Sequence, residues 1–273
     1  MLEKNEKKLY FDAHFHLADC IYDGIIKDSF PSDIYACTCS HSKEEWDVVQ
    51  KFIGGAALRQ AQGPQGVQGP QIFLSYGLHP QSAGYIDVNE CADFLEKLLA
   101  EKKLNAIGEA GFDYFNDEFK ARSDVQEKIF NIQLELAMQY NLPLVIHCRK
   151  ANEKLFEYSK QLKKLPAVLF HSFMGMPSEA LSLLKHGING YFSFGKQVMN
   201  NNKKVIACVR ELPQNVLLTE TDAPWQFLKG QTHTNPEEIR HIFNAFCEIR
   251  AQTPDEMYGI LQQNFITLFS VKQ

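Results

Sequence analysis

The sequence predicts an α/β fold, a (β/α)8 TIM barrel in a single domain, from three observations: short apolar segments, helical stretches between them, and polar residues where the segments end. Eight apolar segments bounded by turn residues are predicted to be strands: 9–13, 34–38, 72–76, 105–108, 144–147, 168–171, 188–194 and 216–220. Strands that alternate with helices form a parallel sheet. Eight such repeats in 273 residues fit a closed barrel of roughly 250 residues, although an open doubly wound sheet shares the local pattern.

Most of the intervening segments have the spacing of amphipathic helices. Between 126 and 140, five apolar side chains fall on one helical face: Ile129, Phe130, Leu134, Ala137 and Met138. The segment 54–71 breaks this pattern, because Gly63 to Gln71 form three Gly-X-Y triplets. Collagen needs far longer arrays and three chains, so we expect a flexible, low-complexity surface insertion before the third strand, inside one domain that covers 1–273.

The composition restricts the compartment and the partners. No apolar run reaches the roughly 18 residues of a membrane span, and the seven Cys include no Cys-x-x-Cys pair, so neither a disulfide framework nor a zinc ribbon is indicated. We expect a cytoplasmic protein with no membrane contact and no obligate protein partner, in which Cys37 and Cys39 are buried core thiols. The net charge of −5 excludes the broadly basic surface of proteins that track long nucleic acids. A nucleic-acid substrate would be held locally, at one end or one scissile phosphate.

Residues with metal-ligand character stand at the carboxyl ends of five predicted strands: His14 and His16, Glu109, His147, His171, and Asp222. In a closed barrel these ends form one rim, where barrel enzymes place their active sites. Period-two alternation puts His14 and His16 on the same side of an extended chain, so both imidazoles reach one ion. Alone, the His-x-His motif would equally describe two buried histidines without a metal, and the four further ligands argue against that interpretation.

Four imidazoles and two carboxylates exceed what one tetrahedral ion requires. The surplus predicts two divalent ions, with Glu109 as the bridge between them. Nitrogen and oxygen ligands suit Zn²⁺, Mn²⁺, Co²⁺ or Mg²⁺, and the spacing does not choose among these. Two such ions activate a bridging water, and Asp222 is the candidate base that accepts its proton, or a ligand only.

Three further residues near the predicted rim are candidates for substrate contact. His79, in Gly-Leu-His-Pro after the third strand, faces the substrate or merely caps the backbone. Arg149 follows His147 by two residues on the same side, where it binds phosphate or forms an ion pair with Asp113 or Glu109. Asp113 orients a histidine or contacts the substrate directly.

Other polar residues are expected to stay outside direct chemistry. Glu220 is predicted to support the metal ligands from behind. His41 and His186 are predicted to lie on loop or helix surfaces as solvated side chains.

Six motifs in order along the chain resemble the TatD family of metal-dependent deoxyribonucleases, within the amidohydrolase-like barrels. They are Phe11-Asp12-Ala13-His14-Phe15-His16-Leu17, Gly77-Leu78-His79-Pro80, Gly108-Glu109-Ala110-Gly111-Phe112-Asp113-Tyr114, Pro143-Leu144-Val145-Ile146-His147-Cys148-Arg149, His171-Ser172-Phe173-Met174-Gly175 and Thr219-Glu220-Thr221-Asp222-Ala223-Pro224-Trp225. The likeness runs from about 9 to 269, and six ordered motifs are specific where any one is not. The resemblance implies the same six metal ligands and a 3′-to-5′ removal of nucleotides from DNA ends.

One loop departs from the resemblance. Family members often carry Arg or Lys shortly before an Asn-Pro segment after the last strand, where this chain has Gly230 to Pro236. Only Lys229 and His233 remain there to supply positive charge, and His233 is the candidate for substrate contact.

The sequence leaves three functions open. The first is a deoxyribonuclease that hydrolyses phosphodiester bonds at DNA or single-stranded ends through a metal-activated water. The second is a two-metal, amidohydrolase-like enzyme that opens a small ester, lactone or cyclic amide. The third, a binding protein without turnover, is disfavoured because the ligand set, including Asp222, is complete.

Overall fold

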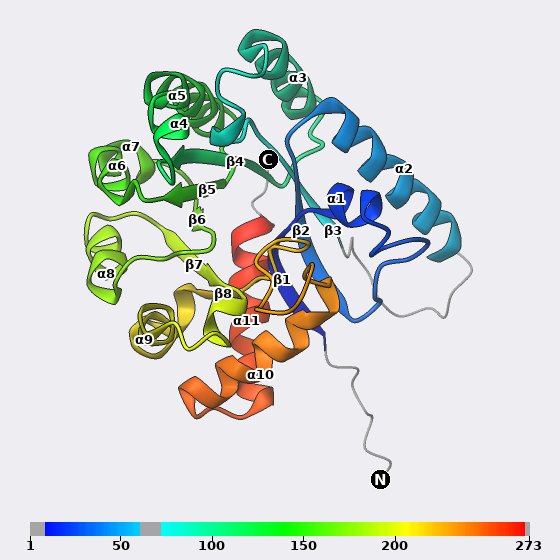
Figure 1. Cartoon of the computed structure of the whole chain (residues 1–273), viewed down its shortest axis with the longest axis vertical. Coiled ribbons are helices and arrows are strands. Elements are labelled where there is room, and N and C mark those ends of the chain that lie inside the picture. Colours follow the sequence, from blue (N-terminus) through cyan, green and yellow to red (C-terminus); the bar gives the residue numbers. More distant parts are fainter. Residues whose placement is uncertain (1–8, 61–71, 271–273) are drawn as a thin grey trace.

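The computed structural model describes residues 9–60 and 72–270, which form a single sheet of eight parallel strands (Figure 1). The strands follow one another around the sheet in chain order: β1 (Tyr10–Phe15), β2 (Ile34–Ser40), β3 (Ile72–Tyr76), β4 (Ala106–Asp113), β5 (Leu144–Arg149), β6 (Val168–Phe170), β7 (Gly190–Phe194) and β8 (Leu217–Thr219). A doubly wound sheet would reverse its strand order at a switch point. The order found here has no reversal and confirms the predicted barrel.

Backbone hydrogen bonds join the chain beyond β8 to β1 and bring the two ends of the sheet together. The amide of Asp222 donates to the carbonyl of His14 at 2.9 Å, and the amide of His16 donates to the carbonyl of Ala223 at 2.8 Å. The predicted metal ligands at the end of β1, His14 and His16, and the one after β8, Asp222, are therefore fixed to each other by the main chain.

Helices surround the strands on the outside (Figure 1). They are α1 (Leu17–Tyr22), α2 (Lys43–Gln60), α3 (Val88–Ala100), α4 (Asp117–Lys120), α5 (Ser123–Tyr140), α6 (Asn152–Glu157), α7 (Ser159–Leu162), α8 (Pro177–Lys185), α9 (Lys203–Glu211), α10 (Ile239–Arg250) and α11 (Pro254–Phe269), with short 3₁₀ turns η1 (Pro80–Ser82), η2 (Lys196–Val198), η3 (Gln214–Val216) and η4 (Pro236–Glu238). Helix α5 confirms the helix predicted at 126–140 and begins three residues earlier. Among the described helices, none has both the length and the apolar character of a membrane span.

Helix α2 corrects the predicted start of the low-complexity insertion. The helix continues to Gln60, so residues 54–60 belong to it. The remainder of the predicted insertion, 61–71, lies outside the described residues. Two adjacent glycines early in this stretch suggested that no helix continues through it. Each glycine lowers helix stability by roughly 1 kcal/mol relative to alanine, and the other helical residues of α2 compensate for this loss.

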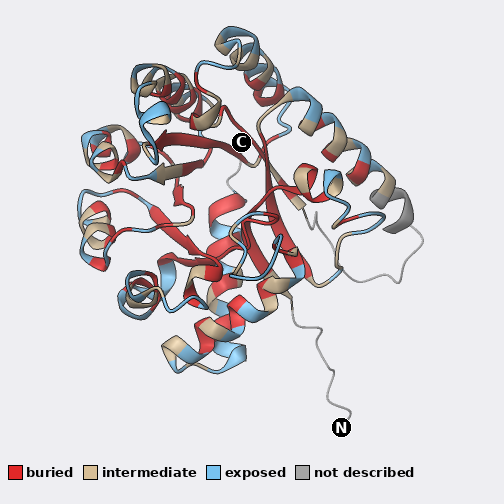
Figure 2. Ribbon diagram, in the orientation of Figure 1, coloured by how far each residue is buried: buried red, intermediate tan, exposed pale blue. Residues whose placement is uncertain are grey.

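The core lies between the strands and the inner faces of the helices, as the burial colouring shows (Figure 2). Every residue of β2 and of β4 is buried, as expected when parallel strands are covered on both faces. Aromatic packing links the layers: the ring of Phe112 on β4 lies 4.8 Å from that of Phe130 on α5. This packing holds the strands that carry the polar rim.

Four strands, β1, β2, β4 and β5, extend further than their apolar segments predicted. Strands β1, β4 and β5 continue through predicted ligands, and the registers of β1 and β4 shift between Asp12 and Phe15 and between Ile107 and Ala110. Such bulges re-aim side chains next to active sites. On β4, Gly111 permits close approach to β5, because a Cβ there would lie 2.0 Å from the carbonyl oxygen of His147.

Candidate metal centre

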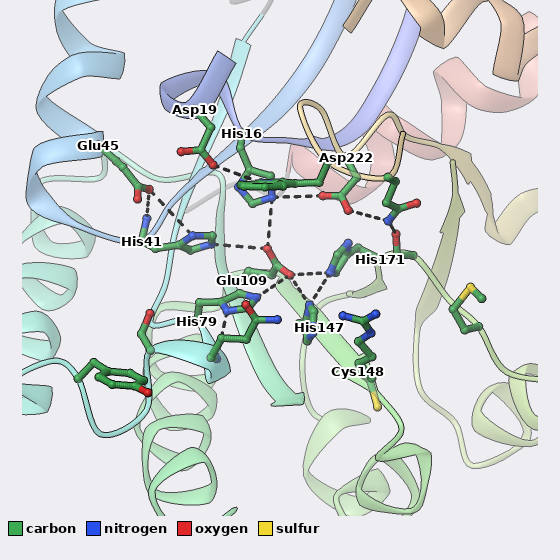
Figure 3. A pocket seen from close by; sticks show the side chains of 18 of the residues that line it. His16, Asp19, His41, Glu45, His79, Glu109, His147, Cys148, His171 and Asp222 are labelled. Atoms are coloured by element: carbon green, nitrogen blue, oxygen red, sulfur yellow. Dashed lines mark hydrogen bonds and ion pairs between the residues drawn. The ribbon is translucent and has the colours of Figure 1, made fainter. Parts of the chain in front are cut away.

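The six predicted metal ligands converge at the carboxyl ends of the strands, on the floor of a cavity of about 740 Å³ (Figure 3). Five of them line this cavity: His16, Glu109, His147, His171 and Asp222. The sixth, His14, is 1% exposed and lies directly beneath. The barrel thus brings together residues up to 208 positions apart in the sequence.

One oxygen of Glu109 faces the first group of ligands. Oε2 lies 3.2 Å from Nε2 of His14 and 3.7 Å from Nε2 of His16. On the other side of these nitrogens, Oδ1 of Asp222 lies 3.5 Å from His14 and 3.2 Å from His16. Four donor atoms from β1, β4 and the loop after β8 therefore surround one small volume.

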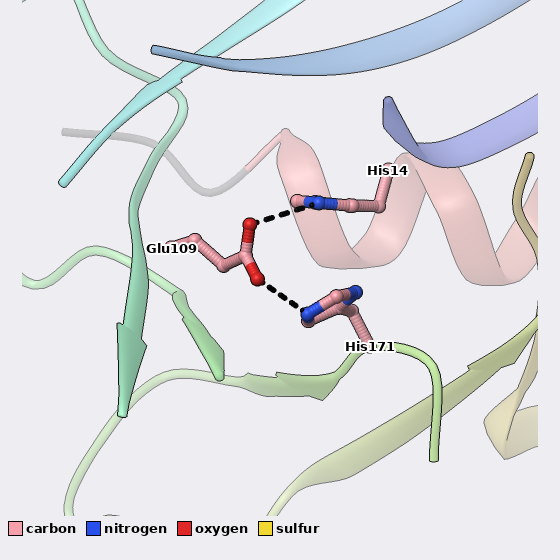
Figure 4. A group of neighbouring side chains, drawn as sticks. All are labelled: His14, Glu109 and His171. Atoms are coloured by element: carbon pink, nitrogen blue, oxygen red, sulfur yellow. Dashed lines mark ion pairs between the residues drawn. The ribbon is translucent and has the colours of Figure 1, made fainter. Parts of the chain in front are cut away.

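The other oxygen of Glu109 faces the second group. Oε1 lies 2.6 Å from Nε2 of His171 and 2.7 Å from Nδ1 of His147. Figure 4 shows the carboxylate placed between His14 and His171, with one oxygen directed at each imidazole. Glu109 therefore lies between the two groups of candidate ligands, with one oxygen toward each.

The arrangement of these donors fits divalent cations. Nε2 of His14 lies 3.2 Å from Nε2 of His16, and Nε2 of His171 lies 3.3 Å from Nδ1 of His147. Oε2 of Glu109 is buried without a hydrogen-bond partner. Converging nitrogens and an unsatisfied carboxylate oxygen are what a cation between them would satisfy, and imidazole with carboxylate suits transition metals.

The protonation states of three of the six candidate ligands already favour metal binding. Burial lowers the pKa of His14 to about 4, so its ring is neutral near pH 7. Burial alone would raise the pKa values of Glu109 and Asp222, but neighbouring imidazoles hold both below their ordinary values. His147 and His171 differ. Burial opposes protonation of both, but hydrogen bonds to Asp113 and Glu109 raise the pKa of His147, and the adjacent Glu109 carboxylate raises that of His171 to about 9. A metal ion at His171 would have to displace a proton.

Carboxylates and amides behind the ligands fix their orientation. Oδ2 of Asp113 lies 3.0 Å from Nε2 of His147 and accepts a hydrogen bond from Gln81 at 2.7 Å. Asp113 is fully buried and is not among the residues that line the cavity, so the structure places it behind His147 and not at the cavity wall. Nε2 of Gln226, which the sequence did not single out, donates to Oδ2 of Asp222 at 2.6 Å.

Glu220 lies behind His171, as the sequence predicted. Its Oε2 lies 3.8 Å from Nδ1 of His171 and accepts a hydrogen bond from Ser193 at 2.6 Å, while Ser172 donates to Oε1 at 2.5 Å. Burial raises the pKa of Glu220 to about 7. Asp12 plays a similar supporting part at the β1–β8 seam, where it accepts from the backbone and hydroxyl of Thr221 at 2.8 and 2.6 Å.

His79 and Arg149 both line the cavity. Nδ1 of His79 accepts from the amide of Gln81 at 3.2 Å, so the ring proton resides on Nε2, which lies 3.3 Å from Oε1 of Glu109. Burial lowers the pKa of His79 to about 3, so the ring is a neutral donor. The guanidinium of Arg149 lies 3.6 Å from the centre of the Phe115 ring, and the ion pair with Asp113 or Glu109 that rivalled a phosphate contact is not formed.

Two loop histidines differ from expectation. His41, predicted to be solvated, lines the cavity with its Nε2 3.5 Å from Oε2 of Glu109; it directly follows the last residue of β2, and the strand-end rule applied to that strand would have found it. His233, predicted to contact substrate, is exposed, bonds to the neighbouring Thr232 at 3.0 Å and is not among the cavity-lining residues. His186 is exposed, as predicted.

Comparison with known proteins gives a consistent result. The family model described as TatD related DNase matches residues 11–270. The uncharacterized metal-dependent hydrolase YabD of Bacillus subtilis is 33% identical over 73% of this chain and 78% of its own length. The 3′-5′ ssDNA/RNA exonuclease TatD of Escherichia coli is 29% identical over 81% of this chain and 87% of its own. The crystal structure of the TatD homologue YjjV of Escherichia coli superposes with a TM-score of 0.77 at 25% identity and covers 96% of this chain and 98% of that one.

Proposed function

The chain belongs to the TatD related DNase family and is a metal-dependent hydrolase, and we propose that it removes nucleotides from the 3′ end of single-stranded DNA by hydrolysing phosphodiester bonds. One observation carries the proposal: a single buried carboxylate, Glu109, presents one oxygen to His14, His16 and Asp222 and the other to His147 and His171. Two ligand groups bridged by one carboxylate are typical of two-metal phosphoryl hydrolysis.

We propose that each group holds one divalent ion. His14, His16 and Asp222 would hold the first ion, His147 and His171 would hold the second, and Glu109 would bridge them. When bound, the pair supplies a water acidified toward neutrality and positive charge for the phosphate oxygens. The four imidazoles favour Zn²⁺, Mn²⁺ or Co²⁺ over Mg²⁺.

Three side chains of the cavity, Asp222, His79 and Arg149, would accept the proton of the water and bind the substrate phosphate. The ionised carboxylate of Asp222, held through Oδ2 by Gln226, is the proposed acceptor for the proton of the attacking water. The neutral His79 places an N–H at the cavity wall, where it donates to Glu109 or to a phosphate oxygen. Arg149 supplies a permanent cation for the substrate phosphate.

The compartment in which the enzyme acts, and its independence of a protein partner, are also proposals. Cys20, Cys37, Cys39 and Cys208 are buried thiols, which supports a reducing compartment and hence action in the cytoplasm. The complete ligand set comes from this one chain, which supports catalysis without an obligate protein partner.

A second candidate function is the hydrolysis of a small ester, lactone or cyclic amide. The cavity favours it in one respect, because its rim includes the carboxylates of Asp19 and Glu45, which repel a polyanion. The same pair of ions would act on a carbonyl centre.

A time course on end-labelled single-stranded DNA tests the proposal. Metal-free protein is incubated with Mg²⁺, Mn²⁺, Co²⁺ or Zn²⁺ in turn, beside Asp222→Asn and with labelled RNA as a second substrate. We expect a ladder from the 3′ end of DNA that requires metal and disappears in the variant. If a folded, metal-loaded protein cleaves no nucleic acid but opens a lactone or cyclic amide, the second function replaces the first.

A further inference from the structure

Large side chains with exposed apolar faces stand at the mouth of the cavity. Tyr85 is 64% exposed, Trp225 is 51% exposed and Met174 is 44% exposed, and all three line the cavity. Tyr85 follows η1 in the loop after β3, and Trp225 lies in the loop after β8, so the two rings approach the opening from different strands. Exposed rings that border an active site mark a contact surface for ligand.

Both rings are held in place although their faces are open to solvent. Nε1 of Trp225 donates to Oδ2 of Asp19 at 3.3 Å. The Tyr85 hydroxyl bonds to Glu118, and the guanidinium carbon of Arg122 lies 3.9 Å from the centre of its ring. One face of Tyr85 is thus covered by a cation and the other is free. Rings fixed in this way lose little further freedom when a planar ligand stacks on them.

The cavity offers little charge with which to hold a nucleic-acid strand. Among the described residues that line it, Arg149 is the single Lys or Arg, while Asp19 and Glu45 contribute negative charge at the rim. Proteins that bind strands through the backbone need several cations to neutralise several phosphates. Affinity for a strand must therefore come from contacts with the bases.

We propose that Tyr85 and Trp225 are stacking platforms for the two bases that flank the scissile phosphate, so that the substrate is a short, unpaired terminus recognised by its bases. This inference rests on the proposed nuclease function. The phosphate lies over Glu109 within reach of Arg149, and the flanking nucleosides extend toward the two loops. Stacking requires each base to leave its neighbours, which excludes a paired end, and it tolerates any sequence because every base has a π-face.

The first experiment pairs changes in the protein with changes in the substrate. Cleavage of a short single strand is compared with cleavage of the same strand whose terminal base is replaced by an abasic tetrahydrofuran residue. In a second substrate the abasic residue takes the penultimate position. We expect the wild-type protein to lose about tenfold in kcat/KM on each abasic substrate, mainly through KM.

The aromatic variants should remove this dependence on the base. Trp225→Ala or Tyr85→Ala should cleave the intact strand about tenfold less efficiently, and each should become indifferent to one of the two abasic positions. Trp225→Phe and Tyr85→Phe, which retain a ring, should recover most of the loss. Phe227→Ala is the matched control, because Phe227 is 49% exposed in the same loop as Trp225 but does not line the cavity.

A binding measurement separates the failure of this inference from the failure of the proposed function. Thymidine 5′-monophosphate should quench tryptophan fluorescence of the metal-loaded wild-type protein, ribose 5-phosphate should not, and Trp225→Phe should abolish the effect. Cleavage with equal rates on intact and abasic ends would overturn the stacking platforms and leave the nuclease intact. If no nucleic acid is cleaved, the proposed function fails, and absence of quenching would then overturn the platforms as well.

Discussion

The carboxylate of Asp113 holds His147 from behind: its Oδ2 lies 3.0 Å from Nε2 of the imidazole. Burial alone would raise the pKa of Asp113, but the hydrogen bonds from His147 and Gln81 lower it to about 2, so this carboxylate can only accept. Nε2 of His147 therefore carries a proton, and Nδ1 faces Oε1 of Glu109 at 2.7 Å. Burial opposes protonation of this ring, but the hydrogen bonds to Asp113 and Glu109 raise its pKa above the ordinary value. The orientation of the imidazole, with Nδ1 toward the other candidate ligands, is fixed before any ion binds.

Replacing Asp113 should weaken the second ion without removing its ligands. Asp113→Asn is expected to lower the affinity of that ion by about 10- to 100-fold, the usual effect of losing such a partner. Competition with a chromophoric chelator measures the affinity. Asp19→Asn, at the same cavity with its carboxylate bonded to Trp225, is the control and should bind both ions normally. Equal affinities in the two variants would contradict the orienting role.

Metal binding should become stronger as the pH rises. The pKa of His171 lies at about 9, so below that value the ring carries a proton that the ion must displace. The apparent affinity should then increase about tenfold per pH unit up to about pH 9 and level off beyond it. Calorimetry in buffers of different ionisation enthalpy counts the protons released. Binding of the second ion with no proton release at pH 7 would be inconsistent with a charged His171.

The convergence of the six candidate metal ligands at one rim could be predicted from the sequence, because they follow apolar segments that form strands. The ends of the strands that carry them could not be predicted exactly. The polar residues His14, Glu109 and His147 interrupt the apolar pattern, so the predicted strands stopped at them, whereas main-chain hydrogen bonds carry the real strands onward. His41 was missed for a related reason, since β2 extends to Ser40 through Cys39, whose thiol donates to the carbonyl of Gly108 at 2.6 Å.

Contacts between loops produce no periodic pattern of residues, so the sequence could not predict them. The predicted role of His233 relied on its place in the chain near Asp222, but the loop turns its side chain to solvent. The sequence also left open whether Asp113 contacts the substrate or orients a histidine. Its place four residues after Glu109 does not determine its partner, which depends on how far β4 extends.

A buried ion pair joins η2 to η4, the turn that follows the loop carrying Trp225. Nζ of Lys196 lies 2.7 Å from Oε2 of Glu238, and the lysine side chain is fully buried. Glu238→Gln would leave that ammonium poorly compensated, and we expect the free energy of unfolding to fall by about 2 kcal/mol at pH 7, less than for a fully buried pair because Glu238 is 19% exposed. Urea denaturation measures the loss. Glu237→Gln, at an exposed pair with Arg240, should cost below about 0.5 kcal/mol.

The same ion pair predicts a pH dependence. Burial would raise the pKa of Glu238, but Lys196 holds it below its ordinary value of 4.5. A carboxyl group with a lowered folded pKa stabilises the protein fully above its ordinary value and loses this contribution as the pH falls through the lowered one. The stability difference between wild type and Glu238→Gln should therefore shrink below pH 4.5. A constant difference down to pH 3 would refute the pairing.

Nuclease activity should depend weakly on salt. With one cation from Arg149 in the described cavity lining, log KM should rise against log salt concentration with a slope of roughly 0.7, the value for one phosphate contact on a single strand. Arg149→Met should flatten that slope and raise KM, whereas Lys229→Met, outside the lining, should leave both unchanged. A slope of several units would reveal phosphate contacts elsewhere on the protein.

The hydrogen-bonded junction between β1 and the chain after β8 determines when during synthesis the first ligand group is complete. His14 and His16 come from the first strand and Asp222 follows the last, and their own backbone amides and carbonyls close the ring. A chain still emerging from the ribosome holds only part of the first ligand group until its eighth strand arrives. We therefore expect the nascent chain to lack activity, and capture of the first proposed ion during refolding to coincide with the final step of barrel formation.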